Sequence, residues 1–530
     1  MPTYLTPGVY VEEVPSASKP IEGVGTSVAA FVGLAPAGPL NTPVQIPNWT
    51  EFVRTFGDPA DAKRRPFLRG SYLAHAVHGY FDNGGTLCWV VRIGGAAHDA
   101  RQAALPSAAG GDMPALQAVA QPGVEEPVKI ELAEESEEEA KEPEGEGEDA
   151  QAPPPPNGGP TYRIEVSAGE EKETWRHLTV ASGPYNILTR VNALSKLIRL
   201  EEVGAGLPEV RRTPAAGTYE LTPAPQNGSA VKAEEIEGDP ASRTGLGGLA
   251  AIDEITMVCV PDLMALGADG NGTIRRLQSR IIAHCEGLED RMAILDPPPG
   301  LMPSEIADWR MDAEGGSGGY DSKFATLYYP WIEVADPFGD GSVMVPPCGH
   351  VAGVWARSDS TRGVHKAPAN EVLRGVTGLG FQVTQSEQST LNPKGVNVIR
   401  SFPGRGVRIW GARTLSSDPE WRYINVRRLF NFVSESIMQG TQWAVFEPND
   451  ARLWLSLRIS TTNFLTRVWR DGALFGSTPD QAFYVKCDAE TNPPDMVEAG
   501  QVTTEIGIAP VKPAEFVVFR ISQYQIGAGE

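Results

Sequence analysis

The sequence is short of the features that mark several common protein classes. Its 530 residues include five cysteines, and no two of them form a CxxC pair. This usage favours a reducing compartment over a disulfide framework. No stretch approaches the length of about 18 apolar residues that spans a bilayer, and the N-terminus lacks a basic region followed by an apolar run. We therefore expect neither a signal peptide nor direct membrane insertion.

Motifs for nucleotide and metal chemistry are also missing. No glycine is followed by lysine, which excludes the phosphate-binding loop GxxxxGK[ST]. The seven histidines show no HExxH spacing, so no zinc site is expected. We expect no cofactor and no metal. Any mechanical work by this protein would draw on energy stored in its folded or assembled state.

Positive charge is scarce and unevenly distributed. The 45 basic and 67 acidic side chains give a net charge of −22, which argues against a general nucleic-acid binder. Residues 123–150 hold 13 acidic and 2 basic side chains beside a Pro-rich run, as is typical of a solvated surface insertion. A calcium-binding or basic-partner role is the alternative for this segment. Residues 394–470, by contrast, hold 12 basic and 5 acidic side chains.

The apolar pattern predicts alternating strands and helices. TLCWVVRI at 86–93 and DEITMVCVPD at 253–262 are typical of buried strands, and residues 270–288 place apolar side chains along one helix face. A strand, this helix and the strand-like RMAILDPP predict a parallel crossover unit. NVIRSFPGRGVRIWGART at 397–414 predicts a hairpin. Two amphipathic helices and three strand-like runs follow, so the chain is expected to be an α/β protein of several domains.

Two short motifs keep an enzyme hypothesis open. GGSGG at 315–319 fits GxSxG and would make Ser317 a nucleophile, but the preceding ADWRMDAE is not the hydrophobic strand that this elbow requires. Cys348 and His350 could form a thiol and imidazole pair, although side chains two residues apart on a short segment usually point in different directions. An α/β hydrolase using Ser317 or Cys348 is thus the rival function.

Several blocks of the chain closely resemble the sheath proteins of contractile phage tails and of phage-tail-like contractile injection systems. They are YLTPGVYVEEVPSASKPIEGVGTSVAAFVGLAPAGP, FDNGGTLCWVVRI, LNPKGVNVIRSFPGRGVRIWGARTLSSDPEWRYINVRRLFNFVSESI and the tail EFVVFRIS. The most specific parts are the PGVYVEE start and the block 391–470. The acidic, Pro-rich insertion at 100–160 departs from the family, so nothing functional is carried over to it.

The resemblance implies a non-enzymatic structural subunit. Such subunits polymerise as stacked six-membered rings around an inner tube, in a metastable extended state, and then contract to drive the tube through a target envelope. The partners implied are further copies of the chain, the inner tube protein, and baseplate and terminal cap proteins, with no nucleic acid. Assembly is expected in the bacterial cytoplasm as part of a phage tail or similar particle, with release by lysis. Another tail or baseplate component is the alternative within structural proteins.

The resemblance also implies a discontinuous architecture. The expected fold is mixed α/β (α+β), with an inner core domain built from two separate parts, inserted outer domains, and extended N- and C-terminal arms. The expected divisions are an arm at 1–22, an inner core at 23–98 and 385–510, a variable insertion at 99–160, an outer α/β domain at 161–384 and a C-terminal arm at 511–530.

The opening segment alternates like a strand but is interrupted by prolines, and it has no core of its own. In the family, such arms complete a β-sheet shared between subunits. This implies a donated strand at Tyr4, Val9, Tyr10, Val11 and Val14. It implies a strand-accepting sheet that includes Phe516, Val517, Val518, Phe519 and Ile521.

Residues 394–470, which carry an excess of basic side chains, supply candidates for a contact with the tube. The first amphipathic helix places Arg427 and Arg428 opposite the side that carries Val426 and Leu429. Because the family places the inner layer of the sheath in the N- and C-terminal regions, Arg422, Arg427 and Arg428 are expected to face an acidic tube surface. Ordinary solvated helix faces are the alternative.

Overall fold

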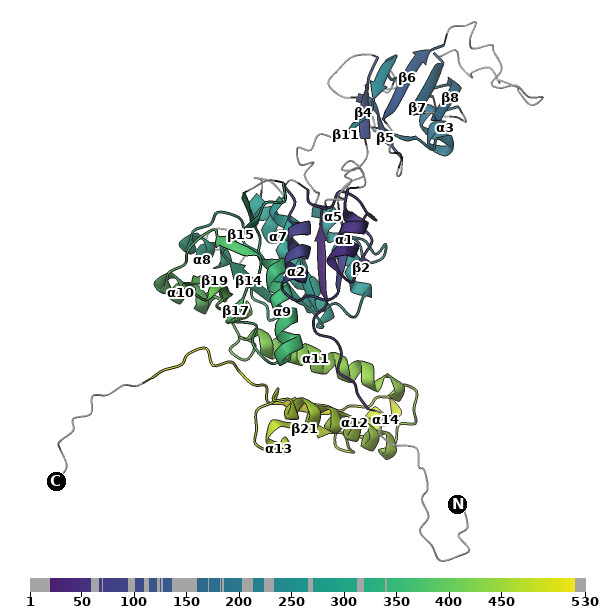
Figure 1. Cartoon of the computed structure of the whole chain (residues 1–530). Helices are drawn as coiled ribbons and strands as arrows, with labels where there is room; N and C mark the ends of the chain where they lie inside the picture. The colour runs from purple at the N-terminus through teal and green to yellow at the C-terminus, as the bar shows by residue number, and fades with distance from the viewer. Residues whose placement is uncertain are drawn as a thin grey trace, which may run out of the picture.

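The computed structural model describes most of the chain and forms three structural units (Figure 1). The described residues are 20–58, 66–68, 70–93, 101–108, 114–121, 124, 127–135, 160–169, 171–181, 183, 185–202, 213–223, 233–265, 270–311, 319–338 and 341–519.

The first unit, the sheet domain, is built on a nine-stranded sheet. Its strand order is β17-β20-β19-β14-β13-β12-β1-β3-β2. The six strands from β19 to β3 are parallel to one another, while β2, β20 and β17 pair antiparallel at the two edges. The strands are β1 (Ala29–Gly33), β2 (Val44–Ile46), β3 (Cys88–Arg92), β12 (Met257–Cys259), β13 (Met292–Leu295), β14 (Ala325–Tyr329), β17 (Glu371–Val372), β19 (Val396–Phe402) and β20 (Gly406–Ile409).

Helices cover both faces of this sheet, which explains why its central strands are apolar throughout. In β1, Ala30 and Val32 contribute to the core on one face, and Ala29 and Phe31 to the core on the other. The first core includes residues of α5 (Ala233–Glu237), α6 (Gly245–Gly248), α7 (Gly270–Leu288), α8 (Pro303–Met311) and α10 (Gln385–Leu391). The second includes residues of α1 (Trp49–Phe56), α2 (Leu73–Asp82) and α9 (Cys348–Arg362).

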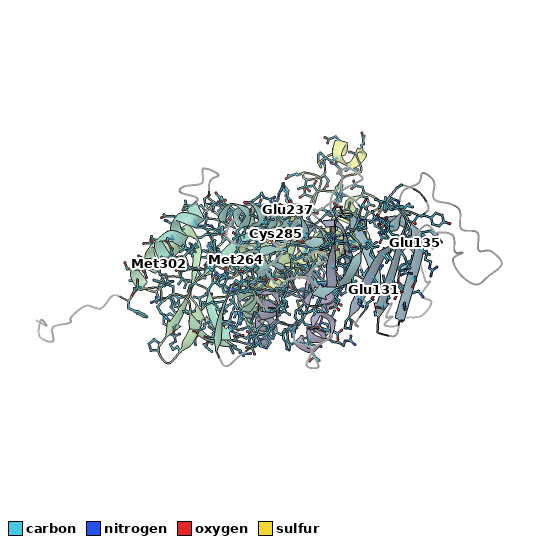
Figure 2. The ribbon with its side chains drawn as sticks, turned by 90° about the horizontal axis from the view of Figure 1, so that it is seen from above. Glu131, Glu135, Glu237, Met264, Cys285 and Met302 are labelled. Carbon is cyan, nitrogen blue, oxygen red and sulfur yellow. The ribbon has the colours of Figure 1, made fainter. Side chains whose placement is uncertain are left out.

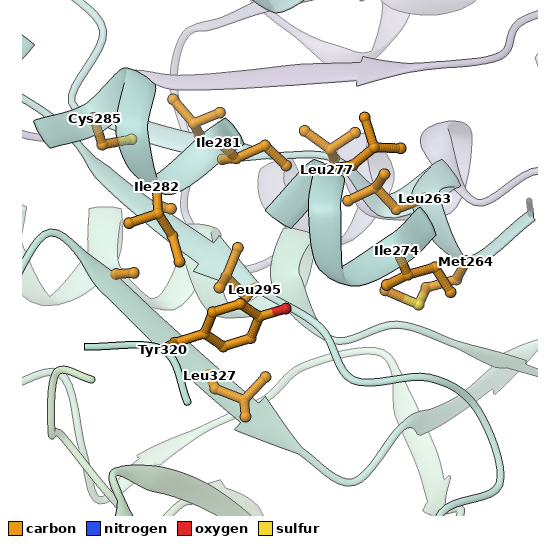
Figure 3. Packing of buried hydrophobic residues seen from close by; sticks show 14 of the residues in the cluster. Leu263, Met264, Ile274, Leu277, Ile281, Ile282, Cys285, Leu295, Tyr320 and Leu327 are labelled. Carbon is orange, nitrogen blue, oxygen red and sulfur yellow. The ribbon is translucent and has the colours of Figure 1, made fainter. Parts of the chain in front are cut away.

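The helix predicted at 270–288 is present as α7, and it packs as its pattern indicates. Ile274, Leu277, Ile281 and Cys285 are buried in the first core. Figure 3 shows these side chains together with residues of the neighbouring strands. The predicted strand, helix and strand unit is confirmed, because β12 and β13 are parallel neighbours.

Smaller elements complete the sheet domain. A three-stranded sheet of order β16-β15-β18 consists of β15 (Ile332–Ala335), β16 (Ser342–Val345) and β18 (Val376–Leu379). Short 3₁₀ helices are η3 (Leu249–Ala251), η4 (Pro261–Ala265) and η5 (Asn392–Lys394). The predicted hairpin is confirmed by the antiparallel pairing of β19 with β20.

The second unit is a sandwich of two four-stranded sheets that share one hydrophobic core. One sheet holds β6 (Val128–Glu134), β7 (Tyr162–Ala168), β8 (Glu171–Leu178) and β10 (Gly217–Glu220). The other holds β4 (Arg101–Pro106), β5 (Pro114–Ala120), β9 (Ile198–Glu202) and β11 (Thr222–Pro223), and α3 (Ile187–Leu194) lies beside them. Seen from above, Glu131 and Glu135 of the sandwich lie on one side of Cys285, and Met302 lies on the other (Figure 2).

The third unit, the C-terminal unit, comprises residues 423–511. Its elements are α11 (Ile424–Thr441), η6 (Gln442–Ala444), α12 (Ala451–Arg470), α13 (Pro479–Ala482), β21 (Phe483–Lys486), α14 (Pro494–Glu498) and β22 (Glu505–Ile508). It lies at the end of the molecule away from the sandwich (Figure 1).

The strand pairing corrects the expected domain boundaries. The nine-stranded sheet contains β1 and β3 from residues 23–98 and β19 and β20 from residues 385–510, and it also includes β12 to β14, which lie between these two segments in the sequence. The expected outer domain at 161–384 is divided between the sandwich and the sheet domain. The insertion at 99–160 contributes β4, β5 and β6 to the sandwich. Local patterning located these strands only in part, and it could not decide which distant strands pair.

No helix in the described ranges is long and apolar enough to cross a lipid bilayer.

Candidate assembly site

The C-terminal unit has a helical core with a small sheet attached. Leu429 and Val433 of α11 pack with Phe464, Leu465 and Val468 of α12. The second helix begins after Asp450, whose side chain accepts hydrogen bonds from the backbone N–H groups of Arg452 and Leu453. β21 packs against α12. This unit therefore presents a β-sheet on a helical support.

The sheet of this unit has two strands. β21 and β22 pair antiparallel, from Phe483 opposite Ile508 to Lys486 opposite Glu505, and no third strand joins them among the described residues. Two-stranded sheets are marginally stable, and their unpaired edges can accept further strands. The outer edges of β21 and β22 are thus sites where another chain segment can pair.

The segment that leads out of β1 towards the N-terminus is fixed to the C-terminal unit. Ile21 is fully buried in the helical core, and the guanidinium of Arg467 donates a hydrogen bond to its carbonyl oxygen. The N–H of Val24 donates to Ser436 Oγ at 3.1 Å. Figure 1 shows this segment running from the sheet domain past α11. Residues 20–28, here called the strap, therefore anchor whatever precedes them.

A buried ion pair joins the strap to both neighbouring units. Arg428 of α11 donates two hydrogen bonds to the carboxylate of Asp359 on α9, at 2.9 and 2.5 Å, and both side chains are 4% exposed. Arg428 also donates to the carbonyl of Thr26 at 2.8 Å, and its guanidinium lies 4.7 Å from the ring centroid of Trp355. Thr26 Oγ1 donates to Asp359 at 2.7 Å. This contact fixes α9, α11 and the strap to one another.

The expectation that Arg428 faces a tube is therefore wrong for the folded chain. Its charged group is enclosed within the subunit, where removing either partner would leave an unpaired buried charge. The amphipathic pattern suggested solvent because it shows the faces of an isolated helix. Here the sheet domain covers the face opposite the apolar one.

Arg427 is also directed inward, which corrects the second candidate. Its guanidinium lies over the rings of Phe324, Trp421 and Phe430, at 4.8, 4.4 and 5.6 Å from their centroids. Its Nε donates to Asn431 Oδ1 at 2.7 Å. Burial lowers the pKa of Arg427 to about 10. The third candidate, Arg422, is half-buried, and its carbonyl accepts a hydrogen bond from Thr414 N–H.

The C-terminal segment has an anchor that sequence reasoning missed. The Glu515 carboxylate accepts hydrogen bonds from Arg413 Nε at 2.9 Å, Arg413 Nη2 at 2.6 Å, Asn392 Nδ2 at 2.8 Å and the Tyr423 hydroxyl at 3.2 Å. Burial disfavours this carboxylate, but the hydrogen bonds from Arg413 and Asn392 hold the pKa of Glu515 below its usual range. The only sequence signal was a lone glutamate before an apolar run.

The apolar run after Glu515 is unpaired in the described chain. Phe516, Val517, Val518 and Phe519 are 75%, 70%, 78% and 83% exposed and belong to no strand. Ile521 and the donor residues Tyr4, Val9, Tyr10, Val11 and Val14 lie outside the described residues. Four adjacent large apolar side chains in solvent mark an interaction segment.

The residues of the enzyme hypothesis are either buried in the core or outside the described residues. The Cys348 thiol is fully buried, and burial raises its pKa well above the usual value, so it is held as a thiol. His350 is buried with a pKa lowered to about 3 by burial. Ser317 lies outside the described residues. Within the described part of the chain, no three His, Cys, Asp or Glu side chains cluster as metal ligands.

Two family models match consecutive parts of the chain. The phage tail sheath protein central domain matches residues 242–415, and the phage tail sheath C-terminal domain matches residues 416–523. Their boundary falls shortly before α11, where the chain leaves the sheet domain for the C-terminal unit.

Related proteins from several phages agree with these family matches. The tail sheath protein of Burkholderia phage BcepMu is 24% identical over 509 residues, covering 93% of this chain and 92% of that protein. The tail sheath proteins of Vibrio phage KVP40 and Salmonella phage ViI are each 24% identical, over 51% and 43% of this chain. These two matches span 40% and 38% of the relatives' own lengths.

Solved structures share the fold over nearly the whole chain. The anti-feeding prophage baseplate structure contains a chain with a TM-score of 0.57 and 23% identity, covering 99% of this chain and 100% of that one. The sheath complex of an extracellular contractile injection system in its contracted state gives a TM-score of 0.55 and 21% identity, covering 99% of each chain. With the two family models together spanning residues 242–523, the chain belongs to the phage tail sheath family.

Proposed function

We propose that this chain polymerises as stacked six-membered rings around an inner tube, in a metastable extended state. Contraction of the polymer would then drive the tube through a target envelope. Its partners are other copies of the chain, the tube protein, and baseplate and cap proteins. Assembly takes place in the bacterial cytoplasm, before release by lysis. Membership of the tail sheath family supports this reading.

The observation that carries the proposal is that the segment next to each chain terminus is anchored to the subunit, while the β21–β22 sheet has unpaired edges among the described residues. The strap is held by Ile21, and the C-terminal segment by Glu515. Both lead to sequences with strand patterning, Tyr4 to Val14 and Phe516 to Ile521. In the polymer, these two segments from neighbouring copies would extend the β21–β22 sheet, because added strands satisfy its open edges.

Anchoring of the two terminal segments also suits a contact between copies that must transmit force. A strand donated by one copy can transmit force to another only if its base is fixed to its own subunit. The buried Ile21 side chain and the four hydrogen bonds of Glu515 supply such fixed points. Because each donated strand would stay attached to a fixed point of its own subunit, neighbouring copies would remain connected while the subunits rotate during contraction.

Of the three tube-facing candidates, Arg422 remains as a proposal, because its side chain is partly accessible. A weak, exposed ion pair of about 0–1 kcal/mol would suit a contact that is broken during contraction.

The test is negative-stain electron microscopy of the purified chain, of a truncation lacking residues 1–19, and of one lacking residues 516–530. We expect long striated cylinders from the full chain and unassembled subunits from each truncation. A matched control deletes residues 138–156, which removes 19 residues from the acidic, Pro-rich insertion and should leave the cylinders intact. Cylinders from both terminal truncations would refute the exchange of strands, and a full-length chain that stays monomeric would refute the polymer.

A further inference from the structure

Three of the seven histidines gather where α2 packs against α9. His75 and His78 lie one turn apart on α2, and His350 lies in the first turn of α9. The two helices are neighbours on the same face of the large sheet (Figure 1). His75 and His350 are 8% and 3% exposed, whereas His78 is exposed. These side chains belong to none of the contacts of the assembly site.

The two helices leave no space between them at this cluster. A Cβ atom added at Gly79 of α2 would lie 2.3 Å from the ring of His350, and one added at Gly349 of α9 would lie 2.2 Å from the carbonyl oxygen of Ala76. His350 Nδ1 is buried and has no hydrogen-bond partner among the described residues. A proton on this nitrogen would therefore be a buried donor without an acceptor, on a side chain that also becomes charged.

Burial favours the neutral form of these imidazoles. It lowers the pKa of His350 to about 3 and that of His75 to about 4, from the ordinary value of 6.5, and repulsion from the neighbouring histidines acts in the same direction. Burial also lowers the pKa of His78. An exposed histidine binds its proton near pH 6.5, so a state in which the helices separate gains protons below that pH. The closed contact is stable above about pH 6.5 and loses stability as the pH falls towards about 4.

Nearby carboxylates do not remove this effect. Asp336, which follows β15, raises the pKa of His75, and Asp82 of α2 raises the pKa of His78. In both histidines burial has the larger influence, so the pKa remains below its ordinary value.

Two buried carboxyl groups lie at the N-terminal ends of the helices and respond to pH in the opposite sense. Asp296 accepts a hydrogen bond from the N–H of Cys348 in α9, and Asp262 accepts one from the N–H of Tyr72 just before α2. Burial raises their pKa values to about 7 and about 6. Their stabilisation is present at low pH and is lost as the pH rises. The contribution of the histidines is therefore measured by comparing variants at the same pH.

We propose that the contact between α2 and α9 is acid-labile and opens as its histidines take up protons. Further along α9, Asp359 binds Arg428 of α11 and Thr26 of the strap. Opening at the histidines would thus loosen the attachment of the strap and the C-terminal unit to the sheet domain. It would occur in a single subunit, whether or not the chain forms the proposed polymer.

Hydrogen exchange of the full-length chain at about pH 7.5 and about pH 5 tests the proposal, with each amide corrected for its intrinsic exchange rate. In the wild type, we expect the protection of α9 amides to fall about a hundredfold, since each of the two buried histidines contributes about tenfold, and the protection of β14 amides to change less. His350→Gln removes one of these groups, so the fall in α9 should be about tenfold smaller. His350→Phe keeps a planar ring and should behave alike if the buried amide of the first variant prevents folding.

The matched control is His284→Gln on α7. Burial lowers the pKa of His284 to about 4 as well, but α7 packs on the opposite face of the sheet. This variant should leave the response of α9 as it is in the wild type.

Three results would overturn the proposal. The first is an equal loss of protection in α9 for the wild type and the folded His350 variants. The second is a parallel loss in β14, which would mean that acid unfolds the whole sheet domain. The third is a reduction by His284→Gln as large as that by His350→Gln, because the effect would then not come from the α2–α9 contact.

Discussion

The sheet domain and the C-terminal unit of this chain satisfy their packing requirements differently. In the sheet domain, both faces of the nine-stranded sheet are covered by helices of the same subunit, and fully buried residues such as Phe31 and Trp355 occupy its core. In the C-terminal unit, a two-stranded sheet has open edges among the described residues, and large apolar side chains such as Phe446 and Phe475 remain in solvent. The sheet domain thus covers its own sheet, whereas the edges of the β21–β22 sheet stay open in the described chain and are the place where we propose that neighbouring copies add strands.

The junction between the two regions should show the largest effect. Arg428→Met leaves Asp359 as a buried unpaired carboxylate, so we expect a loss of about 3–5 kcal/mol in the free energy of unfolding. Urea unfolding followed by circular dichroism would measure it. The double variant Arg428→Met with Asp359→Leu should recover part of the loss, because it removes both charges. An unchanged urea midpoint for the single variant would contradict the role of the ion pair.

Truncating the buried side chain of Ile21 in the strap should lower the stability of the C-terminal unit more than that of the sheet domain. Ile21→Ala removes a fully buried side chain, which should cost about 2–5 kcal/mol. We expect faster hydrogen exchange at the Val24 amide, which bonds Ser436, and little change at the amides of β13. Val445→Ala, at a position 64% exposed, is the matched control. Equal acceleration in both regions would mean that they unfold as one unit.

The sheet domain should respond to pH through a buried carboxylate. Burial raises the pKa of Asp296 to about 7, and its carboxylate accepts a hydrogen bond from Cys348 N–H at 2.9 Å. A raised folded-state pKa means that the native state binds the proton more tightly than the unfolded chain, so this stabilisation is present at low pH and is lost as pH rises through about 7. Asp296→Asn, which stays neutral, should therefore gain melting temperature relative to the wild type between pH 5 and pH 8.

The control for this pH effect is Asp308→Asn at an exposed position of α8, whose difference from the wild type should stay flat over the same range. If the melting-temperature difference between Asp296→Asn and the wild type shrinks as the pH rises, the prediction is wrong.

The smallest effect on stability is expected at the exposed C-terminal run. Phe516→Ser with Val518→Ser changes side chains that are 75% and 78% exposed, so the free energy of unfolding of the isolated subunit should change by less than about 0.5 kcal/mol. The same change should abolish cylinders in electron micrographs, since it removes apolar contacts made only between copies. A large drop in the urea midpoint would show that the run packs within its own subunit.

Local features of the fold were predictable because local sequence determines them. The Pro-Gly-Arg-Gly turn fixed the β19–β20 hairpin, and the spacing of Ile274, Leu277 and Ile281 defined the buried face of α7. The grouping of strands was not predictable in this way. Ala29 pairs with Met257, 228 residues away, and no local pattern specifies such a partner.

The features of the candidate site can be separated in the same way, into those that local sequence determines and those that depend on distant contacts. The strand-like termini and the surplus of positive charge in 394–470 are properties of composition and pattern, so the sequence by itself determined them, together with membership of the sheath family. Which arginines are available to partners was decided only by the tertiary structure. Arg427 and Arg428 are enclosed by the sheet domain and by aromatic rings, while Arg452 and Arg458 remain in solvent. The physical reason is that a side chain's exposure depends on what packs against its helix, and here those neighbours come from segments far away in the chain.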